Sequence, residues 1–496
     1  MAMGVWISLF GYFALMIAIG IYAMRTSTSS SEDYILGGRS LSPKVAALSA
    51  GASDMSGWLL LGLPGALYVS GLASAWIGIG LFVGALVNWT LVAPRLREQT
   101  VHYGNAITIP SFLANRFPTQ ALSLRTVAAI VIVIFFAVYT ASGLVAGGKL
   151  FESAFAGIFN FGGLSDYAVG IIITLGVVLA YTVVGGFLAV SMTDFVQGVI
   201  MMLALVLMPA VALFGADGGG YAQATQTLNE ADPTLLSWTA GLTFIGWLSA
   251  VTWGLGYFGQ PHIIVRFMAI RTLKEVPIAR NIGMGWMGIS LIGAISLGIF
   301  GRAYAIRNGM DIEDPETIFI ILSDLLFHPL ITGFLYAALL AAVMSTISSQ
   351  LLVSSSSLTE DFYRLFLHKE ANDRECVNVG RVCVVLVGLV AAVIASDPDS
   401  QVLALVSNAW AGFGAAFGPL IILSLMWSRT NGAGAITGMV VGAVTVILWI
   451  ALGWNGEFMG GPGVYEIIPG FIASMIAILV VSSVTADSGE YQHITR

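Results

Sequence analysis

One carboxylate lies deep inside an apolar run of this 496-residue chain. Asp54 stands within SAGASDMSGWLLLGLPG, residues 49–65, where an ionised side chain needs a partner or a water-filled cavity. The glycines and Pro64 of this run weaken a helix, so we expect an unwound segment with free backbone carbonyls beside Asp54. The alternative is that Asp54 only caps the half-helix that follows, through the amides of Ser56 and Gly57.

A second apolar run contains a similar interruption. In TWGLGYFGQP, residues 252–261, three glycines and Pro261 alternate with Trp253 and Tyr257. The spacing predicts that the helix opens here, with aromatic faces beside free backbone groups. The two aromatic side chains have another interpretation, as an interfacial belt near the cytoplasmic end of the span.

A third candidate is the run LLAAVMSTISSQLLVSSSS, residues 339–357. Ala342, Ser345, Thr346 and Ser349 recur at helical spacing, so their oxygens share one side of a helix. Na⁺ is a hard cation that prefers several oxygen ligands, and two hydroxyls with carbonyls of an unwound helix would serve. These hydroxyls would equally suit bonding to their own helix or to a neighbouring helix, and both interpretations stay open.

The composition identifies the elements that must position these residues. Hydrophobic residues make up 57% of the chain and charged residues 9%, against about 25% charged in soluble domains. The chain is therefore expected to be an all-α integral membrane protein. A net charge of −7 excludes a nucleic-acid surface, and no phosphate loop, metal cluster or nucleophile motif indicates an enzyme. Cys376 and Cys383 are expected to be free thiols.

Thirteen apolar runs are candidates to span a bilayer, given a threshold of about 18 residues. They are residues 4–24, 44–70, 73–93, 126–151, 165–184, 190–213, 238–258, 282–303, 329–352, 381–396, 402–426, 434–453 and 466–484. The first is expected to be a retained helix, since no positive charge or cleavage site marks a signal peptide. The two predicted interruptions are five spans apart and so run in opposite directions, as in the inverted repeats of secondary transporters.

The basic residues test this count through the positive-inside rule. If the first loop is cytoplasmic, only Lys149, Arg302 and Arg307 lie outside. The inner side then holds Arg25, Arg39, Lys44, Arg95, Arg97, Arg116, Arg125, Arg266, Arg271, Lys274, Arg280, Arg364, Lys369, Arg374, Arg381, Arg429 and Arg496. This asymmetry predicts an external N-terminus and a cytoplasmic C-terminus.

Three further features are interpreted more simply. Gly434, Gly438 and Gly442 form a stripe of small residues, which favours helix packing over dimerisation. Asp194 is placed near the inner surface, where a solvated cap is slightly favoured over a place on an ion exit route. His262 is interpreted as a loop histidine.

Six stretches together resemble one known family of transporters. They are YILGGRSLSP (34–43), SAGASDMSGWLLLGLPGA (49–66), VGGFLAVSMTDFVQ (184–197), WGLGYFGQPHIIVRFMA (253–269), LAAVMSTISSQLLVSSSSLTED (340–361) and AWAGFGAAFGP (409–419). The likeness covers essentially the whole chain and is to the solute:sodium symporter family. ASDMSGW combined with WGLGYFGQPH is most similar to the proline-transporting branch of that family.

The resemblance implies a fold and a set of site residues. The fold would be leucine-transporter-like, a single domain over residues 1–496 with inverted repeats of five helices at 44–213 and 238–426, and peripheral helices in 1–43 and 427–496. A Na⁺ site would be formed by Ala52, Met55, Ala342, Ser345 and Thr346. Proline contacts would be made by Ser56, Gly57, Tyr139, Trp253, Tyr257 and Pro261. Asp54 and Arg39 match residues linked to ion coupling, and Arg39 would equally suit the role of an anchor at the inner membrane surface.

The implied function is import of L-proline coupled to Na⁺ by alternating access, without an organic cofactor. The protein would work as a monomer, embedded in the lipid of the bacterial cytoplasmic (inner) membrane. Another small amino acid or organic solute is the first alternative; a sugar would need more donors and acceptors than the second interruption offers. A channel or a membrane sensor is less favoured. The short tails, with no output domain, argue against a sensor, and saturable, concentrative uptake would separate a transporter from a channel.

Overall fold

The computed structural model describes residues 1–26 and 29–485, and almost all of this part is helical. In this part, ten helical segments are long and apolar enough to cross a membrane, which confirms the expected class of all-α membrane protein. Arg496, which the charge count placed on the inner side, lies outside the described residues. Cys376 is buried, Cys383 is half-buried, and both are free thiols as expected.

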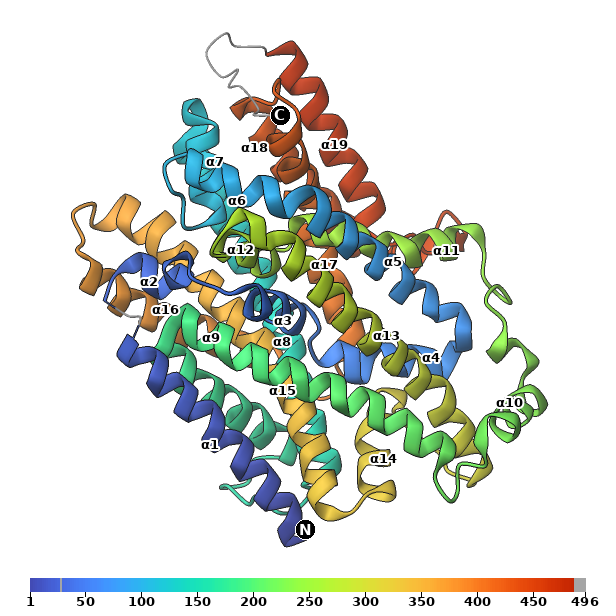
Figure 1. Ribbon diagram of the computed structural model, residues 1–496. Coiled ribbons are helices and arrows are strands. Elements are labelled where there is room, and N and C mark those ends of the chain that lie inside the picture. The colour runs from blue at the N-terminus through green and yellow to red at the C-terminus, as the bar shows by residue number, and fades with distance from the viewer. Residues whose placement is uncertain (27–28, 486–496) are drawn as a thin grey trace.

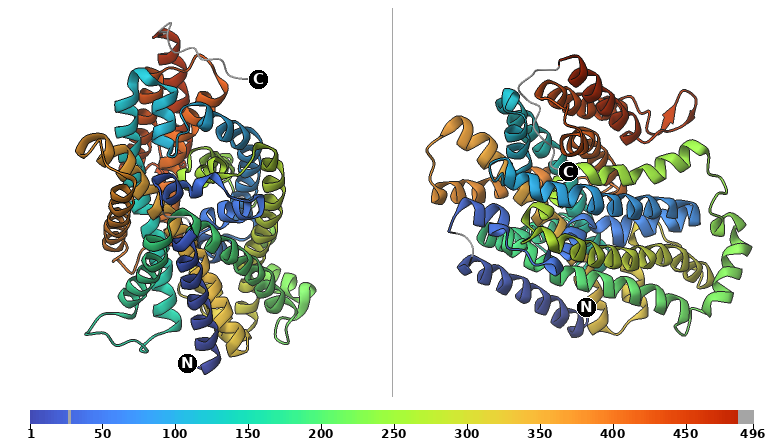
Figure 2. Two further views of the ribbon diagram at one scale, coloured as in Figure 1. Left: turned by 60° about the vertical axis from the view of Figure 1, so that its left-hand side comes forward. Right: turned by 45° about the horizontal axis from the view of Figure 1, so that its top comes forward.

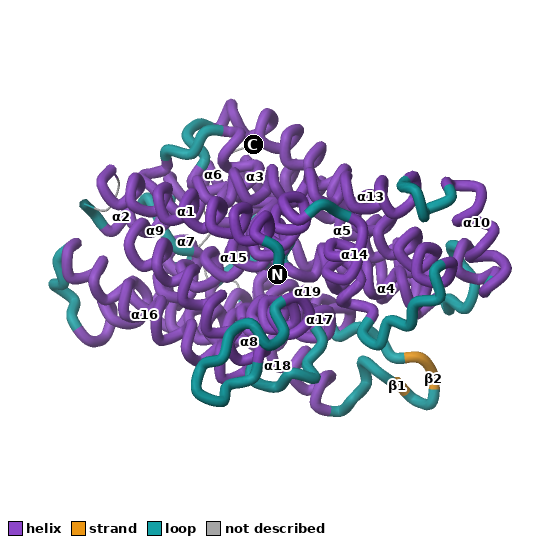
Figure 3. The backbone as a smooth tube through the Cα atoms, turned by 90° about the horizontal axis from the view of Figure 1, so that it is seen from below, coloured by secondary structure: helices purple, strands orange, loops and turns teal. Residues whose placement is uncertain are grey.

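The helices are α1 (Met3–Thr26), α2 (Ser31–Leu36), α3 (Pro43–Asp54), α4 (Leu63–Ser70), α5 (Ala75–Val87), α6 (Ala93–His102), α7 (Ile109–Arg116), α8 (Ala121–Ala154), α9 (Asp166–Phe214), α10 (Gly220–Ala231), α11 (Phe244–Val251), α12 (Pro261–Ala269), α13 (Val276–Arg307), α14 (Ile318–Leu326), α15 (Pro329–Leu358), α16 (Asp373–Ile394), α17 (Val402–Met426), α18 (Gly432–Ala451) and α19 (Ile467–Val484). One short antiparallel pair, β1 (Glu457–Phe458) and β2 (Gly461–Pro462), lies at the edge of the molecule (Figure 3).

The second predicted span is interrupted at Asp54, as expected. Helix α3 begins at Pro43, with the Ser42 side chain as its cap, and ends at Asp54, because Met55 adopts a ψ of 86°. The chain then resumes as a π-helical turn, Trp58–Gly62, that leads into α4. The carbonyls around the interruption are therefore released from a continuous helical ladder.

The seventh predicted span is also interrupted, but the expected boundary of this span was wrong. Its predicted end is residue 258, whereas α11 continues as a 3₁₀ segment, Thr252–Gly259, and the chain then forms α12. Pro261 occupies the first turn of α12, where its missing N–H removes no helical hydrogen bond. The interruption therefore lies in the middle of this segment.

The fifth and sixth predicted spans are joined without a loop in α9. The join is at Gly186, whose φ of 63° and ψ of −151° are accessible to glycine and strained for other residues. Likewise, the second half of the second span and the third span form one long segment, Trp58–His102. These joins, and the short helices of the seventh span, explain why ten continuous helices correspond to thirteen apolar runs.

The centre of the protein is formed by α15 and α17. The apolar windows of these two helices are 83% buried within the protein, against 28% for α1. Helices α1, α9 and α15 lie side by side (Figure 1), while α18 and α19 pack together at one edge in both views of Figure 2. Gly434 and Gly438 of α18 lie against Ser482 and Ile478 of α19, which confirms packing as the role of the glycine stripe.

Candidate functional site

The two interruptions meet at Asp54. The Tyr257 hydroxyl donates a 2.5 Å hydrogen bond to Asp54 Oδ2. The main-chain carbonyl of Asp54 accepts hydrogen bonds from the Trp58 indole at 3.2 Å and from the Tyr139 hydroxyl at 3.4 Å. All four side chains are buried. Asp54 is thus held by groups from α8 and from the 3₁₀ segment as well as by its own segment.

The Asp54 side chain does not act as the helix cap considered as an alternative. Gly57 is the N-cap residue of the π-helical turn, and no side chain caps this turn at Gly57. The Ser56 amide donates to the main-chain oxygen of Asp54 at 3.1 Å, not to its carboxylate. The nearer cap is Ser56 itself, whose Oγ accepts from the Trp58 amide at 3.4 Å.

Four of the five groups expected to bind Na⁺ lie together between α3 and α15. Ser345 Oγ lies 2.6 Å from the Ala52 carbonyl oxygen and 3.1 Å from that of Ala342. Thr346 Oγ1 lies 3.4 Å and 3.2 Å from the same two oxygens. Met55 follows one residue after Asp54, at the interruption itself. Two hydroxyls and two carbonyls from separate helices thus form a buried oxygen cluster suited to a hard cation.

The expected proline contacts lie on both sides of the Asp54 link. Ser56 and Gly57 are buried at the interruption. Tyr139 of α8 contacts the same place, because its hydroxyl donates to the Asp54 carbonyl. Pro261 is buried at the start of α12. The next residue, His262, is not the loop histidine expected: it is fully buried in α12, with its ring edge-on to Phe136 and Tyr139 at centroid distances of 5.3 and 5.4 Å.

Trp253 lies beside this centre and borders two cavities. The cavities measure about 430 and 440 Å³ and are also lined by Ser407, and the Trp253 ring stacks on Tyr465 at 5.2 Å. The Trp410 indole donates to the Trp253 carbonyl at 2.7 Å. Trp253 is 6% and Tyr257 2% exposed, so the interpretation of these residues as a lipid-facing aromatic belt was wrong.

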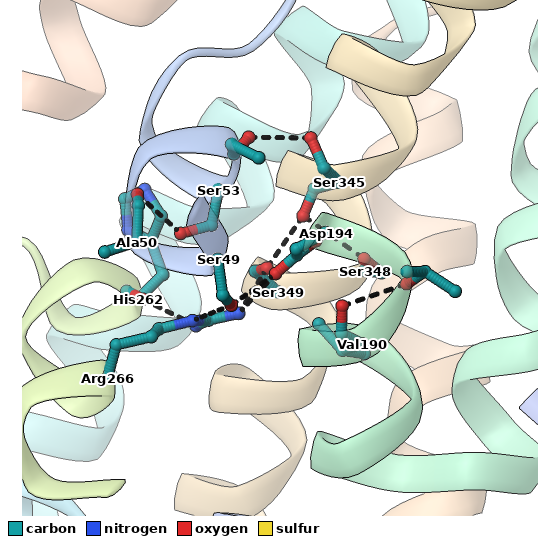
Figure 4. A network of polar contacts seen from close by, with 12 residues as sticks. Ser49, Ala50, Ser53, Val190, Asp194, His262, Arg266, Ser345, Ser348 and Ser349 are labelled. Carbon is teal, nitrogen blue, oxygen red and sulfur yellow. Dashed lines mark hydrogen bonds and ion pairs between the residues drawn. The ribbon is translucent and has the colours of Figure 1, made fainter. Parts of the chain in front are cut away.

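Asp194 is the centre of a second buried polar network (Figure 4). Its Oδ2 accepts from Ser49 Oγ at 2.7 Å and forms an ion pair with Arg266 at 3.2 Å. The Arg266 guanidinium also donates to Ser349 Oγ at 2.6 Å and to Ser49 at 3.1 Å. Asp194 and Arg266 are both 0% exposed, so the solvated cap was wrong, and Asp54 is not the only deep carboxylate.

This network is continuous with the oxygen cluster. Ser349 Oγ donates to the Ser345 carbonyl at 2.7 Å, so the guanidinium is two hydrogen bonds away from a candidate ion ligand. The four elements involved are α3, α9, α12 and α15, as Figure 4 shows. The signal in the sequence was the single arginine in the apolar helix that follows the second interruption.

Arg39 lies apart from the central site. Its guanidinium donates to the Met268 carbonyl at 2.7 Å, the Ala106 carbonyl at 2.5 Å and Asn105 Oδ1 at 3.0 Å. Burial lowers the pKa of Arg39 to about 10, and the group stays charged at neutral pH. Arg39 therefore connects the segment before α3 with the end of α12 and the loop after α6.

Comparison with known proteins places this architecture among cation-coupled transporters. Residues 34–442 match the sodium:solute symporter family. The chain is 51% identical over 485 residues to the osmoregulated proline transporter OpuE of Bacillus subtilis (strain 168), covering 98% of this chain and 96% of that protein. It is 53% identical over 470 residues to the high-affinity proline transporter PutP of the same strain, covering 95% of this chain and 96% of that protein.

Two further proteins are similar over nearly their whole length. The sodium/proline symporter of Staphylococcus aureus (strain JH9) is 50% identical over 487 residues, covering 97% of this chain and 92% of that protein. The solved structure of a Na⁺-coupled sialic acid symporter, in a substrate-bound outward-open state, superposes with a TM-score of 0.78 at 20% identity, covering 97% of this chain and 98% of that one.

Proposed function

Because the chain belongs to the sodium:solute symporter family, we propose that it imports L-proline together with Na⁺. The protein is a multi-pass membrane transporter and not an enzyme. Three relatives of about 50% identity over nearly the whole chain are named proline transporters or sodium/proline symporters, and this likeness carries the choice of cargo.

The proposed Na⁺ site is the oxygen cluster between α3 and α15. Its ligands are the carbonyls of Ala52, Met55 and Ala342 and the hydroxyls of Ser345 and Thr346. The hydroxyls now donate to these carbonyls, and rotation of both O–H groups would present their oxygens to an ion instead. An ion there would hold α3 against α15. Asp54 lies two residues after Ala52, so ion binding would also change the position of Asp54.

The proposed proline site lies around the Tyr257–Asp54 contact. The apolar pyrrolidine ring would pack on the aromatic faces of Trp253, Tyr257 and Tyr139. Ser56, Gly57 and Pro261, at the two helix interruptions, would supply polar backbone groups to the carboxylate and the ammonium. The cavities beside Trp253 support access to this site from one side of the protein.

Proline transport would be coupled to Na⁺ entry by alternating access. The protein would have thirteen membrane spans. Residues 44–213 and 238–426 would form the two inverted repeats, with residues 1–43 and 427–496 at the periphery. The N-terminus would be external and the C-terminus cytoplasmic in the cytoplasmic (inner) membrane, with the monomer as the working unit. A Na⁺ ion that enters down 100 mV releases about 2.3 kcal/mol, which supports accumulation without ATP.

The test is uptake of labelled L-proline into proteoliposomes of the purified protein. We expect transient accumulation above equilibrium with an inward Na⁺ gradient and none with an equal K⁺ gradient. Accumulation driven by Na⁺ but displaced by another small solute instead of proline would retain the mechanism and reject the cargo. Equilibration that does not respond to the gradient would indicate a channel.

A further inference from the structure

Tyr465 is a buried residue in the turn directly before α19. Its ring stacks on the Trp253 indole, with the centroids 5.2 Å apart and an angle of 21° between the planes. The Tyr465 hydroxyl donates to the Ser407 carbonyl at 2.8 Å, and its main-chain amide donates to Ser249 Oγ at 3.2 Å. The ring that stacks on Trp253 is therefore held at its hydroxyl end and at its main-chain end.

The partners of Tyr465 belong to the walls of the two cavities beside the proposed cargo site. Trp253 and Ser407 line both cavities, and Tyr465 contacts each of them. Ser249 lines the cavity of about 430 Å³ and lies four residues before Trp253, so both face the same side of their segment. Tyr465 thus fixes the residues that stand between the two cavities.

The turn that carries Tyr465 is itself packed tightly against α17 and α18. A Cβ atom on Gly414 of α17 would lie 2.8 Å from the Ile467 side chain of α19 and 2.9 Å from Gly256 Cα of the 3₁₀ segment. The start of α19 and the 3₁₀ segment therefore approach the same residue of α17. The carbonyl of the residue before Tyr465 accepts from the Trp449 indole of α18 at 2.9 Å. Such a supporting frame can hold a side chain in one orientation.

We propose that Tyr465 is a positioning residue for the cargo, an inference that rests on the proposed function, in which Trp253 contacts proline. Tyr465 holds the Trp253 indole at the angle at which the pyrrolidine ring packs on it, so the turn before α19 belongs to the cargo site although it lies outside the two proposed repeats. An apolar ring is recognised by the shape of the surface that it contacts, because dispersion contacts are lost across small gaps. Release of the indole should therefore weaken proline binding and admit a larger ring.

The first test is labelled L-proline uptake into proteoliposomes under an inward Na⁺ gradient. Tyr465→Leu should raise the proline KM about fivefold, as expected for loss of an aromatic pair, with the half-saturating Na⁺ concentration at saturating proline unchanged. Tyr465→Phe keeps the stacked ring and should restore most of the affinity; Tyr465→Met replaces the leucine variant if that variant does not insert. The matched control is Phe458→Leu, which removes a ring stacked on Trp449 at 4.9 Å in the same α18–α19 connection. An equal rise in KM in this control would overturn the proposal.

The second test asks whether Tyr465 acts through Trp253. In a Trp253→Ala background, Tyr465→Leu should raise the proline KM little further, because the indole that it positions is already absent. Tyr465→Leu alone should also bind pipecolate, the homologue with one more ring carbon, better relative to proline in a competition assay. Independent, multiplying effects on KM, or a lower maximal rate with KM and the competition ratio unchanged, would show that the stack only packs helices. If the unsubstituted protein takes up no proline, the proposed function fails, and the role of Tyr465 fails with it.

Discussion

The Tyr257 hydroxyl and the Asp54 carboxylate, 203 residues apart in the chain, are joined by a 2.5 Å hydrogen bond. Each belongs to one of the two interrupted segments, so this bond connects the segment that carries the proposed ion ligands to the segment that carries aromatic proline contacts. A ligand that changes the position of one segment must therefore change the position of the other, which is the physical requirement for coupled binding.

Asp54→Asn should remove the stimulation of proline uptake by Na⁺ at concentrations that saturate the unsubstituted protein, while the protein still inserts into the membrane. The amide keeps an acceptor for Tyr257 and removes the negative charge, so we expect the Na⁺ concentration for half-maximal uptake to rise roughly tenfold or more. The measurement is labelled proline uptake as a function of Na⁺, normalised to the amount of protein in the membrane. Near-normal Na⁺ dependence would remove Asp54 from the mechanism.

Tyr257→Phe removes the hydrogen bond to Asp54 and leaves the Asp54 side chain unchanged. The ring remains for packing and only the hydroxyl is lost; hydrogen bonds to charged groups contribute about 1.5–3 kcal/mol. We expect the proline KM to become less sensitive to the Na⁺ concentration. Tyr167→Phe is the matched control, because the Tyr167 hydroxyl bonds the Ala395 carbonyl at 2.7 Å, away from the site. If both variants behave alike, the Asp54 bond does not couple the ligands.

Ser345→Ala with Thr346→Ala should raise the half-saturating Na⁺ concentration by roughly tenfold, since two of the proposed oxygen ligands are lost. The control is Ser355→Ala on the same helix, whose buried hydroxyl donates to the Leu352 carbonyl of that helix. The measurement is again uptake against Na⁺ at fixed proline. An unchanged half-saturation would reject the site between α3 and α15.

The interruptions were predictable from sequence and several polar contacts were not. Glycine and proline around Asp54 act locally, within one turn of the backbone, so their effect is visible in the sequence. Asp194 is paired with Arg266, 72 residues later, and such a pair exists only after the helices have packed. The seventh span is predicted to end at residue 258, next to the glycines and Pro261 of the interruption, but proline also begins helices, and Pro261 lies in the first turn of α12.

The difference between local signals and contacts made by packing also explains which candidate site residues could be found from the sequence. Ser345 and Thr346 were found by their periodicity on one helix, and their partner Ala52 only through the family resemblance, since its carbonyl carries no side-chain signal. His262 was assigned to a loop because α12 was not expected.

Trp253→Ala should weaken proline binding more than Na⁺ binding. The indole stacks on Tyr465 and lines two cavities, so its removal would widen the route beside the proposed cargo site. We expect a rise in the proline KM and little change in the Na⁺ dependence at saturating proline. Trp6→Ala on α1 serves as the control for loss of an indole elsewhere. A loss of expression alone, with unchanged KM, would contradict a substrate contact.

The buried pair Arg266–Asp194 should show strong coupling in a double-mutant cycle. Arg266→Met or Asp194→Leu alone leaves the other charge buried and unpaired, which destabilises proteins by about 3–5 kcal/mol, whereas replacing both members by apolar groups costs less. We expect both single variants to lower Tm and the double variant to regain part of the loss. The double variant should nevertheless bind Na⁺ more weakly, because Ser349 loses its guanidinium partner and holds Ser345 less firmly. Additive losses of Tm would show that the two charges do not stabilise one another, and full Na⁺ affinity in the double variant would separate this network from the ion site.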